Sequence, residues 1–310
     1  MKLSLLRTIS LLASFSSSAL AAPTQKRATI CNGQAALCDR KYSNVSFVGA
    51  HDSAFVGQLP TQNQLKSVSD QLNSGVRFLT AQTHSFLNSQ YMCHTSCWEE
   101  NSGKVQAYVQ TVKTWLDNNP NEVVTLLLTN GDKIAMSIFD SIFKAVGADK
   151  YKFIPSTSPN PMPMDSWPTL GDMITAGTRL VVFIDYGADE KTVPYLLDEF
   201  NYFFETPFDT TDPNFAQCTM DRQNKADNDG KSSMYIVNHF LDMKIPATSV
   251  LVPDRADAGK TNAATGTGSI GAQADLCVGS WGKQPNVVLV DYFGQGQEMN
   301  AQNTMNGLSS

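Results

Sequence analysis

Basic residues are scarce in this chain, and they are not clustered. Lysine and arginine together number 23 among 310 residues, against 29 aspartates and glutamates, which gives a formal net charge of −6. No run of three or more basic side chains occurs anywhere in the sequence. A protein that holds nucleic acid presents a basic patch or stripe to the phosphate backbone. The sequence therefore excludes nucleic acid as an expected partner.

Long hydrophobic runs are also absent. The apolar stretch that ends near Leu20 is too short and too rich in serine to span a membrane. Its basic start and its ending in Ala19-Leu20-Ala21 are typical of a secretory signal peptide. We expect a signal peptide over residues 1–21, a pro-segment over residues 22–27 and a mature, monomeric, secreted chain over residues 28–310. The C-terminus has no hydrophobic tail, so no stable membrane anchor is expected.

Six cysteines are present, and an even number in a secreted chain favours disulfide bonds. Proximity in sequence suggests the pairs Cys31–Cys38, Cys93–Cys97 and Cys218–Cys277, although six cysteines allow about 15 pairings. A zinc site built from Cys93, His94 and Cys97 is the alternative, but no second Cys/His pair has metal-ligand spacing. Asn44-Val-Ser46 is a glycosylation sequon, which can be occupied if Asn44 lies on the rim of the fold.

Short, almost continuous apolar runs recur along the chain, with helical patterns between them. Such runs are typical of parallel strands that are covered on both faces. About eight strands in about 280 residues predict a single-domain α/β fold, a TIM-type (β/α)8 barrel with long loops tied by disulfides. The strong runs are Val45–Ala50, Val76–Ala81, Val123–Thr129, Leu180–Tyr186, Tyr235–Phe240 and Val287–Phe293, and the weaker ones are Tyr151–Ile154 and Tyr202–Phe204. The helical patterns are Val105–Asn118, Ile134–Val146 and Leu170–Met173. Loops are expected at Pro155–Pro168, Asp209–Ser233 and Asp254–Gly282.

The chain has only four histidines, and two of them follow strand-like runs. His51 and Asp52 end the first run, and His94 comes shortly after the second. Because the carboxyl ends of barrel strands meet at one mouth, these side chains are expected to converge there. Two imidazoles at one rim provide a general base and a general acid, the pair that can cleave a phosphodiester. Further polar residues at strand ends are Gln82, Asn130, Asp185, Asn238 and Asp291.

An ordered set of motifs resembles one known family. Gly49-Ala-His51-Asp-Ser53 is similar to the Gly-Thr-His-Asp-Ser motif of phosphatidylinositol-specific phospholipase C X domains, and the likeness is strongest to the secreted fungal branch. The likeness extends from Val45 to Phe293 and implies a TIM-type barrel. The other matching segments are Gly75-Val-Arg-Phe-Leu79, the position of His94, Asn119-Pro-Asn-Glu-Val-Val-Thr-Leu-Leu-Leu-Thr-Asn130 and Asn286-Val-Val-Leu-Val-Asp-Tyr-Phe293.

The resemblance implies roles for four residues. His51 would be the general base and His94 the general acid, with Asp291 orienting His51 and Asp52 pairing with His94. The partner would be a phosphodiester, either a small molecule or a lipid headgroup. Gln82, Asn130, Asp185 and Asn238, as polar residues at the same mouth, would contact that substrate. No Gly-x-Ser-x-Gly motif is present, which argues against a serine esterase.

The chain departs from the family where the phosphate charge is countered. Bacterial members have an arginine after the second strand and eukaryotic members have acidic calcium ligands, but the positions here are Thr80 and Gln82. No calcium, other metal or cofactor is therefore expected. The departure leaves an alternative open, a catalytically impaired barrel that binds a sugar, a lipid headgroup or a cell-wall component. A structural extracellular protein with no ligand is a third hypothesis.

Overall fold

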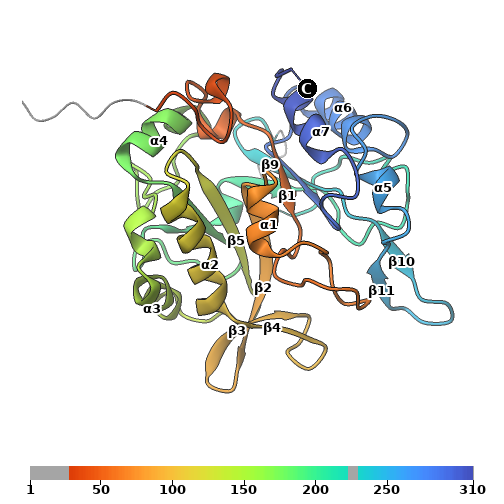
Figure 1. Ribbon diagram of the computed structural model, residues 1–310, viewed down its shortest axis with the longest axis horizontal. Coiled ribbons are helices and arrows are strands. Elements are labelled where there is room, and N and C mark those ends of the chain that lie inside the picture. The colour runs from red at the N-terminus through yellow and green to blue at the C-terminus, as the bar shows by residue number, and fades with distance from the viewer. Residues whose placement is uncertain (1–27, 223–229, 310) are drawn as a thin grey trace, which may run out of the picture.

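The computed structural model describes residues 28–222 and 230–309. The predicted signal peptide and pro-segment lie outside the described residues. Figure 1 shows a curled parallel sheet with helices around its outer face. Within the described ranges, none of the helices combines the length and the apolar character that crossing a bilayer requires.

The sheet has eight strands in one hydrogen-bonded path, and every neighbouring pair in that path is parallel. In spatial order the strands are β7 (Leu196–Asp198), β6 (Leu180–Ile184), β5 (Val124–Asn130), β2 (Phe78–Phe86), β1 (Phe47–Ala50), β12 (Val287–Val290), β9 (Met234–Asn238) and β8 (Phe203–Glu205).

The two edge strands, β7 and β8, are consecutive in sequence but are not paired in the described part of the chain. A 3₁₀ turn at Glu199–Asn201 and Tyr202 join them. The structure thus shows the predicted α/β class with a curled sheet, whereas a barrel closed by hydrogen bonds all the way round is not shown. The weak run Tyr151–Ile154 was wrongly predicted as a strand, because only Lys152 forms a bridge to Leu180 there.

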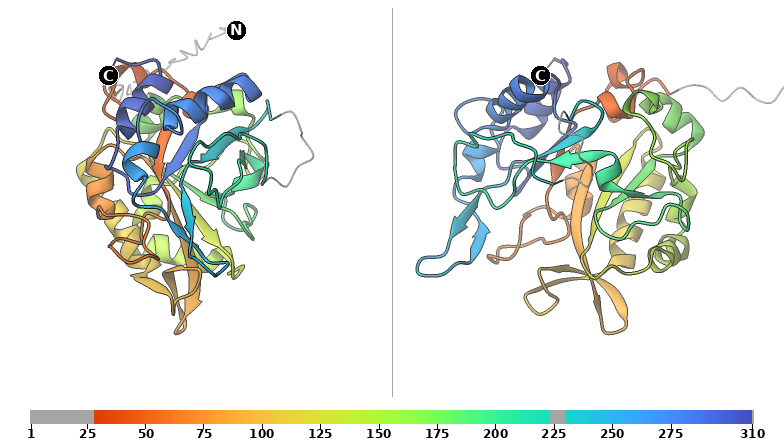
Figure 2. Two further views of the ribbon diagram at one scale, coloured as in Figure 1. Left: turned by 90° about the vertical axis from the view of Figure 1, so that its right-hand side faces the viewer. Right: turned by 180° about the vertical axis from the view of Figure 1, so that it is seen from behind.

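The carboxyl end of the sheet carries two antiparallel hairpins. β2 continues past the sheet and pairs with β3 (Ser89–His94), which pairs with β4 (Glu100–Lys104). The second hairpin consists of β10 (Asp242–Lys244) and β11 (Leu251–Pro253). Both project from the body of the molecule in Figures 1 and 2. They therefore frame the mouth at which the predicted site residues were expected.

The helices form where apolar residues recur with helical spacing. In α2 (Val105–Asn118) the buried residues Val105, Val109, Val112 and Leu116 make one face, which packs against the sheet. The prediction of a loop at Asp254–Gly282 was wrong, because this segment contains the helices α5 and α6. The remaining helices are α1 (Val68–Asn73), α3 (Met136–Val146), α4 (Leu170–Ala176), α5 (Ala258–Thr261), α6 (Ile270–Trp281) and α7 (Glu298–Met305).

Two apolar clusters fill the two faces of the sheet. Along β6, Leu180, Val182 and Ile184 join the cluster under the helices, and Val181 and Phe183 join the cluster inside the curl. This alternation follows from the pleat of a strand, in which successive side chains point to opposite faces. Burial on both faces is what the continuous apolar runs predicted.

The predicted cysteine pairs are confirmed. Cys31–Cys38, Cys93–Cys97 and Cys218–Cys277 are all disulfide-bonded. The bond between Cys93 and Cys97 rules out the zinc site that shares these thiols. The Cys218–Cys277 bond joins the segment after β8 to α6. It therefore links the two long segments 209–233 and 254–282. Asn44 is exposed, so its glycosylation stays a prediction.

Gly49 in β1 faces a space too small for a side chain. A Cβ atom there would lie 2.8 Å from Leu289 Cδ2 and 3.0 Å from the carbonyl oxygen of Phe78. We expect Gly49→Ala to lower the free energy of unfolding by about 1–3 kcal/mol, the usual cost of overpacking a core. Chemical denaturation measures the change.

Gly279→Ala is the matched control. Gly279 lies in the exposed part of α6, and a Cβ atom there would have no neighbour within 4 Å. Alanine is favoured over glycine in a helix, so this variant should be up to about 1 kcal/mol more stable than wild type. An unfolding free energy of Gly49→Ala equal to that of wild type would contradict the packing described for β1.

Candidate active site

The tip of β1 places two titratable side chains at the mouth of the sheet. The backbone N–H of His51 donates to the carbonyl oxygen of Val290 at 2.9 Å, which continues the pairing with β12. The backbone at Asp52 then turns with a positive φ of 44°, a conformation that aspartate tolerates better than most residues. Its N–H donates to Thr80 Oγ1 at 3.0 Å. This turn presents both side chains to one cavity.

His51 is held from one side by the carboxylate of Asp291, which directly follows β12. The Nδ1–Oδ1 distance is 2.8 Å. Asn63 Nδ2 donates to both oxygens of Asp291, at 3.1 and 3.2 Å, and so fixes that carboxylate. The imidazole also stacks on the ring of Phe240, with 3.7 Å between ring centroids. Because Nδ1 faces Asp291, Nε2 is the nitrogen that faces the cavity.

His94, the last residue of β3, is held in the same manner by a different group. Its Nδ1 lies 2.8 Å from the carbonyl oxygen of Thr61. A carbonyl only accepts, so Nδ1 carries the proton and Nε2 is left to exchange one with a ligand. The ring stacks on Phe55 at 5.2 Å between centroids. The disulfide Cys93–Cys97 closes the turn that follows His94.

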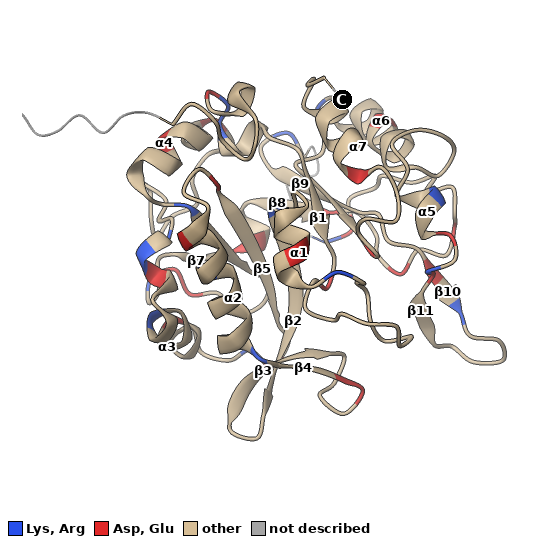
Figure 3. Cartoon of the chain, viewed as in Figure 1, with Lys and Arg blue, Asp and Glu red and all other residues tan. Residues whose placement is uncertain are grey.

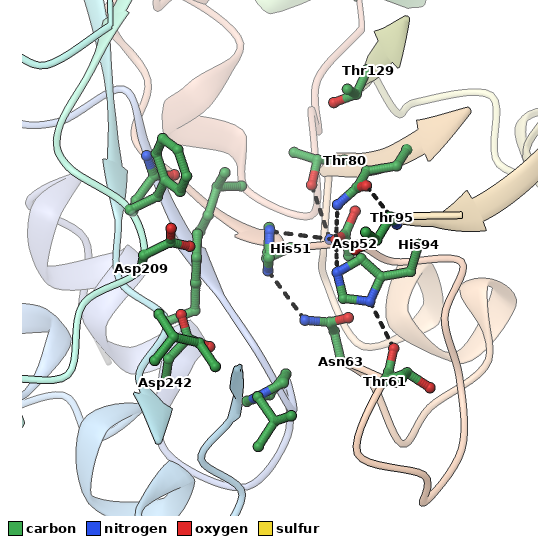
Figure 4. A pocket seen from close by; sticks show the side chains of 18 of the residues that line it. His51, Asp52, Thr61, Asn63, Thr80, His94, Thr95, Thr129, Asp209 and Asp242 are labelled. Carbon is green, nitrogen blue, oxygen red and sulfur yellow. Dashed lines mark hydrogen bonds and ion pairs between the residues drawn. The ribbon is translucent and has the colours of Figure 1, made fainter. Parts of the chain in front are cut away.

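One carboxylate oxygen lies between the two imidazoles. Asp52 Oδ2 is 3.6 Å from His51 Nε2 and 3.4 Å from His94 Nε2. Gln82 Nε2 donates to the same oxygen at 3.0 Å. Figure 4 shows the two histidines on either side of Asp52. The structure therefore brings together all four residues for which catalytic roles were expected, and the roles themselves stay predictions.

The charges around His51 favour its protonated form. Burial alone would lower the pKa of His51, but the carboxylates of Asp52, Asp291 and Asp242 outweigh it and raise the pKa to about 9. Burial also raises the pKa of Asp291, against the opposing influence of His51. Burial and the proximity of Asp291 raise the pKa of Asp242 to about 7. The charges of this site thus favour the protonated form of His51 at neutral pH.

These groups open into a cavity of about 490 Å³. Its opposite wall includes Asp209 and Asp242, which Figure 4 shows across from the histidines. Among the described residues that line it, Arg222 is the one with a guanidinium or ammonium group. Figure 3 shows other lysines and arginines distributed over many elements. The described lining of the cavity is therefore rich in carboxylates and includes one permanent cation.

Arg222 is itself balanced by neighbouring acids. Its Nη1 lies 3.1 Å from Glu205 Oε2 and its Nη2 lies 3.5 Å from Asp185 Oδ2. Nη2 also donates to the hydroxyl of Tyr186 at 2.9 Å. Burial raises the pKa of Asp185 to about 6, although the charge of Arg222 opposes the shift. This wall offers alternating donors and acceptors of the kind that bind hydroxyl groups.

The four predicted substrate contacts are placed differently from one another. Gln82, Asp185 and Asn238 line the cavity, and Asn238 also donates to Glu205 Oε2 at 3.2 Å. Asn130 is fully buried and is not among the lining residues. Its side chain instead bonds to backbone groups of Ile134 and Tyr186. Its geometry therefore supports a role in holding loops.

Sequence reasoning missed three residues of the site. Arg222 lies in a segment predicted only as a long loop, away from the positions where the family carries its arginine or its calcium ligands. Asp242 belongs to a hairpin that no pattern indicated. Asn63 lies in the polar run Thr61-Gln62-Asn63-Gln64, where nothing in the sequence distinguishes it from its neighbours.

The other two histidines lie outside this arrangement. His84 Nδ1 pairs with Asp132 Oδ1 at 3.1 Å. His239 is fully buried, and its ring nitrogens bond to Gln273 and to the carbonyl oxygen of Thr261. Neither of these two histidines lines the cavity. In the described ranges, no group of three or more His, Cys, Asp or Glu side chains is arranged to hold a metal ion.

The sequence of the chain matches a known family along most of its length. The model of the family described as PI-PLC X 1 matches residues 37–306. The chain belongs to the PI-PLC X family. A PI-PLC X domain-containing protein 1 of Arthroderma benhamiae is 53% identical over 281 residues, which cover 90% of each protein. An uncharacterized secreted protein of the same fungus is 40% identical over 281 residues. The match covers 88% of this chain and 62% of that protein.

Solved structures show the same fold at low sequence identity. The phosphatidylinositol-specific phospholipase C from Listeria monocytogenes aligns with a TM-score of 0.56 and 14% identity, covering 88% of this chain and 96% of that one. A variant of the Staphylococcus aureus enzyme of the same name aligns with a TM-score of 0.55 and 16% identity, covering 88% and 95%. At this identity the likeness establishes the shared fold.

The acid cluster around His51 gives a testable titration. We expect the His51 imidazole to titrate near pH 9, and Asp242→Asn to lower its midpoint, because Asp242 is ionised at that pH and stabilises the imidazolium. Histidine NMR signals followed against pH measure both values. The control is Asp132→Asn, which removes a carboxylate beside His84 and should leave the His51 midpoint in place. A His51 midpoint near 6.5 in wild type would contradict the described field.

Proposed function

We propose that this chain is a secreted phosphoric diester hydrolase that cleaves its substrate by acid–base catalysis with His51 and His94. The observation that carries the proposal is the pair of imidazole Nε2 atoms at one carboxylate, 3.6 and 3.4 Å from Asp52 Oδ2, in one open cavity. Each Nδ1 is occupied by a separate partner, so both Nε2 atoms are free to exchange protons with a ligand. Membership of the PI-PLC X family supports phosphodiesters as the substrate class.

The proposed reaction uses a hydroxyl group of the substrate as the nucleophile. His51 Nε2 takes the proton of a hydroxyl next to the phosphate, and that oxygen forms a new bond to phosphorus. The bond from phosphorus to the leaving oxygen breaks, and His94 Nε2 gives its proton to that oxygen. The products are a cyclic phosphodiester and an alcohol, and hydrolysis of the ring would follow with the roles reversed.

An apolar wall beside the polar site supports a lipid as the source of the phosphodiester. Val250, Leu251 and Val252 of the β10–β11 hairpin line the cavity. Val250, together with Met243 and Ile245, is also exposed to solvent on the outside of the hairpin. Exposed apolar clusters next to a binding site favour contact with an apolar partner. A lipid would place its headgroup between the histidines and its apolar part along this wall.

A binding protein without turnover is the second candidate, and one observation favours it. The single guanidinium in the cavity already pairs with Glu205 and Asp185, so it is not free to counter the charge that develops on phosphorus. Loss of one such stabilising group costs about 3 kcal/mol or more in typical enzymes. The same cavity could then hold a sugar, a lipid headgroup or a cell-wall component and release it unchanged.

Release of a cyclic phosphodiester from a glycerophospholipid with a hydroxylated headgroup tests the proposal, with phosphorus NMR as the readout. We expect a bell-shaped dependence of the rate on pH, because His51, whose pKa is raised to about 9, must lose its proton before it accepts one, while His94 must keep the proton that it donates. His51→Ala and His94→Ala should each lower kcat by about 10²–10⁴-fold. His84→Ala is the matched control and should retain the wild-type rate, since His84 pairs with Asp132 away from the cavity.

The same experiment separates the alternatives. Turnover that survives His51→Ala would contradict the acid–base assignment. Binding of the headgroup in calorimetry without any cyclic product would favour the binding protein. Comparing the lipid with the water-soluble diester of the same headgroup tests whether the apolar wall contributes. Chelator in all assays tests the expectation that no metal is needed.

Secretion is part of the proposal. It is supported by three disulfides in the described chain, by the signal-peptide pattern over residues 1–21 and by a 40% identical relative named as a secreted protein. Mass spectrometry of protein recovered from the culture medium of a fungal host is the check. A chain that starts near Ala28 is expected, and retention of Met1 in that protein would count against the assignment.

A further inference from the structure

Both ends of the Gln82 side chain are bonded within the protein. Gln82 Oε1 accepts from the backbone N–H of Thr95 at 3.0 Å, and Nε2 donates to Asp52 Oδ2, also at 3.0 Å. Because a backbone N–H can only donate, the amide oxygen must face Thr95. The NH₂ group is thereby directed at the carboxylate. The orientation of the amide is fixed by its two partners.

These two partners belong to the two halves of the site. Asp52 follows β1 and lies against both imidazoles. Thr95 directly follows His94, has a positive φ of 60° and lies in the turn closed by the Cys93–Cys97 disulfide. Gln82, in the middle of β2, therefore bridges the turn that carries the presumed acid to the carboxylate that both histidines share.

We propose that Gln82 is a positioning residue that sets the placement and the charge balance of His51 and His94 through Asp52. The inference rests on the proposed function for its catalytic meaning, although its geometric part does not. Thr80 Oγ1 holds the backbone of Asp52, and the Gln82 amide holds its side chain. Together the two residues fix the carboxylate at similar distances from the two rings.

The Gln82 amide adds no charge beside Asp52. A cationic side chain at the same place would form an ion pair with Asp52 and compete with both imidazoles for its charge. An amide donates a hydrogen bond and leaves the full negative charge to the histidines. Position 82 thus serves here to preserve the shared carboxylate, whereas the cation of the cavity, Arg222, comes from the segment after β8.

Two substitutions of similar length separate the two bonds. Gln82→Glu keeps an oxygen for the Thr95 N–H but places a second carboxylate against Asp52. We expect the titration midpoint of His51 to rise by about one pH unit, since added negative charge at this range stabilises the imidazolium. Gln82→Met keeps the volume and removes both bonds. For it we expect kcat to fall about tenfold or more with little change in KM, because the reacting groups are misplaced.

Gln110→Glu is the matched control for the change of charge. Gln110 is exposed on α2 and bonds to Thr114, so the His51 midpoint should equal that of wild type. The buried His239 is an internal reference in the same NMR spectra. Thermal unfolding of each variant shows whether the fold is retained.

The titration does not need turnover, so failure of the inference and failure of the proposed function are distinguishable. An unchanged midpoint for His51 in folded Gln82→Glu would overturn the positioning role even if wild type cleaves a diester. A raised midpoint in a protein that releases no cyclic product would support the positioning role and refute the hydrolase. Wild-type kcat in Gln82→Met would overturn the catalytic part.

Discussion

The site depends on one carboxylate that two imidazoles share. Asp52 Oδ2 lies within 3.6 Å of the Nε2 atoms of both His51 and His94. In a buried setting the free energy of such a contact is several times that at the surface, because water does not screen it. The second carboxylate, Asp291, adds to the same field at His51. The resulting charge balance decides which ring holds a proton when a substrate arrives.

The fold makes this arrangement possible by bringing distant segments to one rim. β1 lies between β2 and β12 in the sheet, so the residues that follow or line these strands become neighbours. Asp52 comes from the first, Gln82 from the second and Asp291 from the third. Gly49 lets β1 lie close to β2 and β12. Packing inside the sheet and chemistry at its mouth are therefore coupled through a strand of four residues.

The sequence was sufficient for the parts that obey a simple period or spacing. Buried parallel strands and the amphipathic helix at Val105–Asn118 were predicted with the correct type, and so were three disulfides between nearby cysteines. The unpaired edges β7 and β8 could not be predicted in the same way, because each strand is only three residues long and leaves little pattern. Arg222 and Asp242 reach the cavity through irregular segments and a short hairpin, whose course tertiary packing decides. Motif resemblance pointed to His51 and His94. Gln82 was predicted as a substrate contact, whereas its amide bonds to Asp52 in the structure.

The most direct test of the carboxylate at Asp52 is the titration of His51 in Asp52→Asn. The substitution keeps the shape of the side chain and removes its charge. The account predicts that the midpoint of His51 falls by about one pH unit or more from the value near 9 in wild type, in a protein that remains folded. An unchanged midpoint in the folded variant would contradict it.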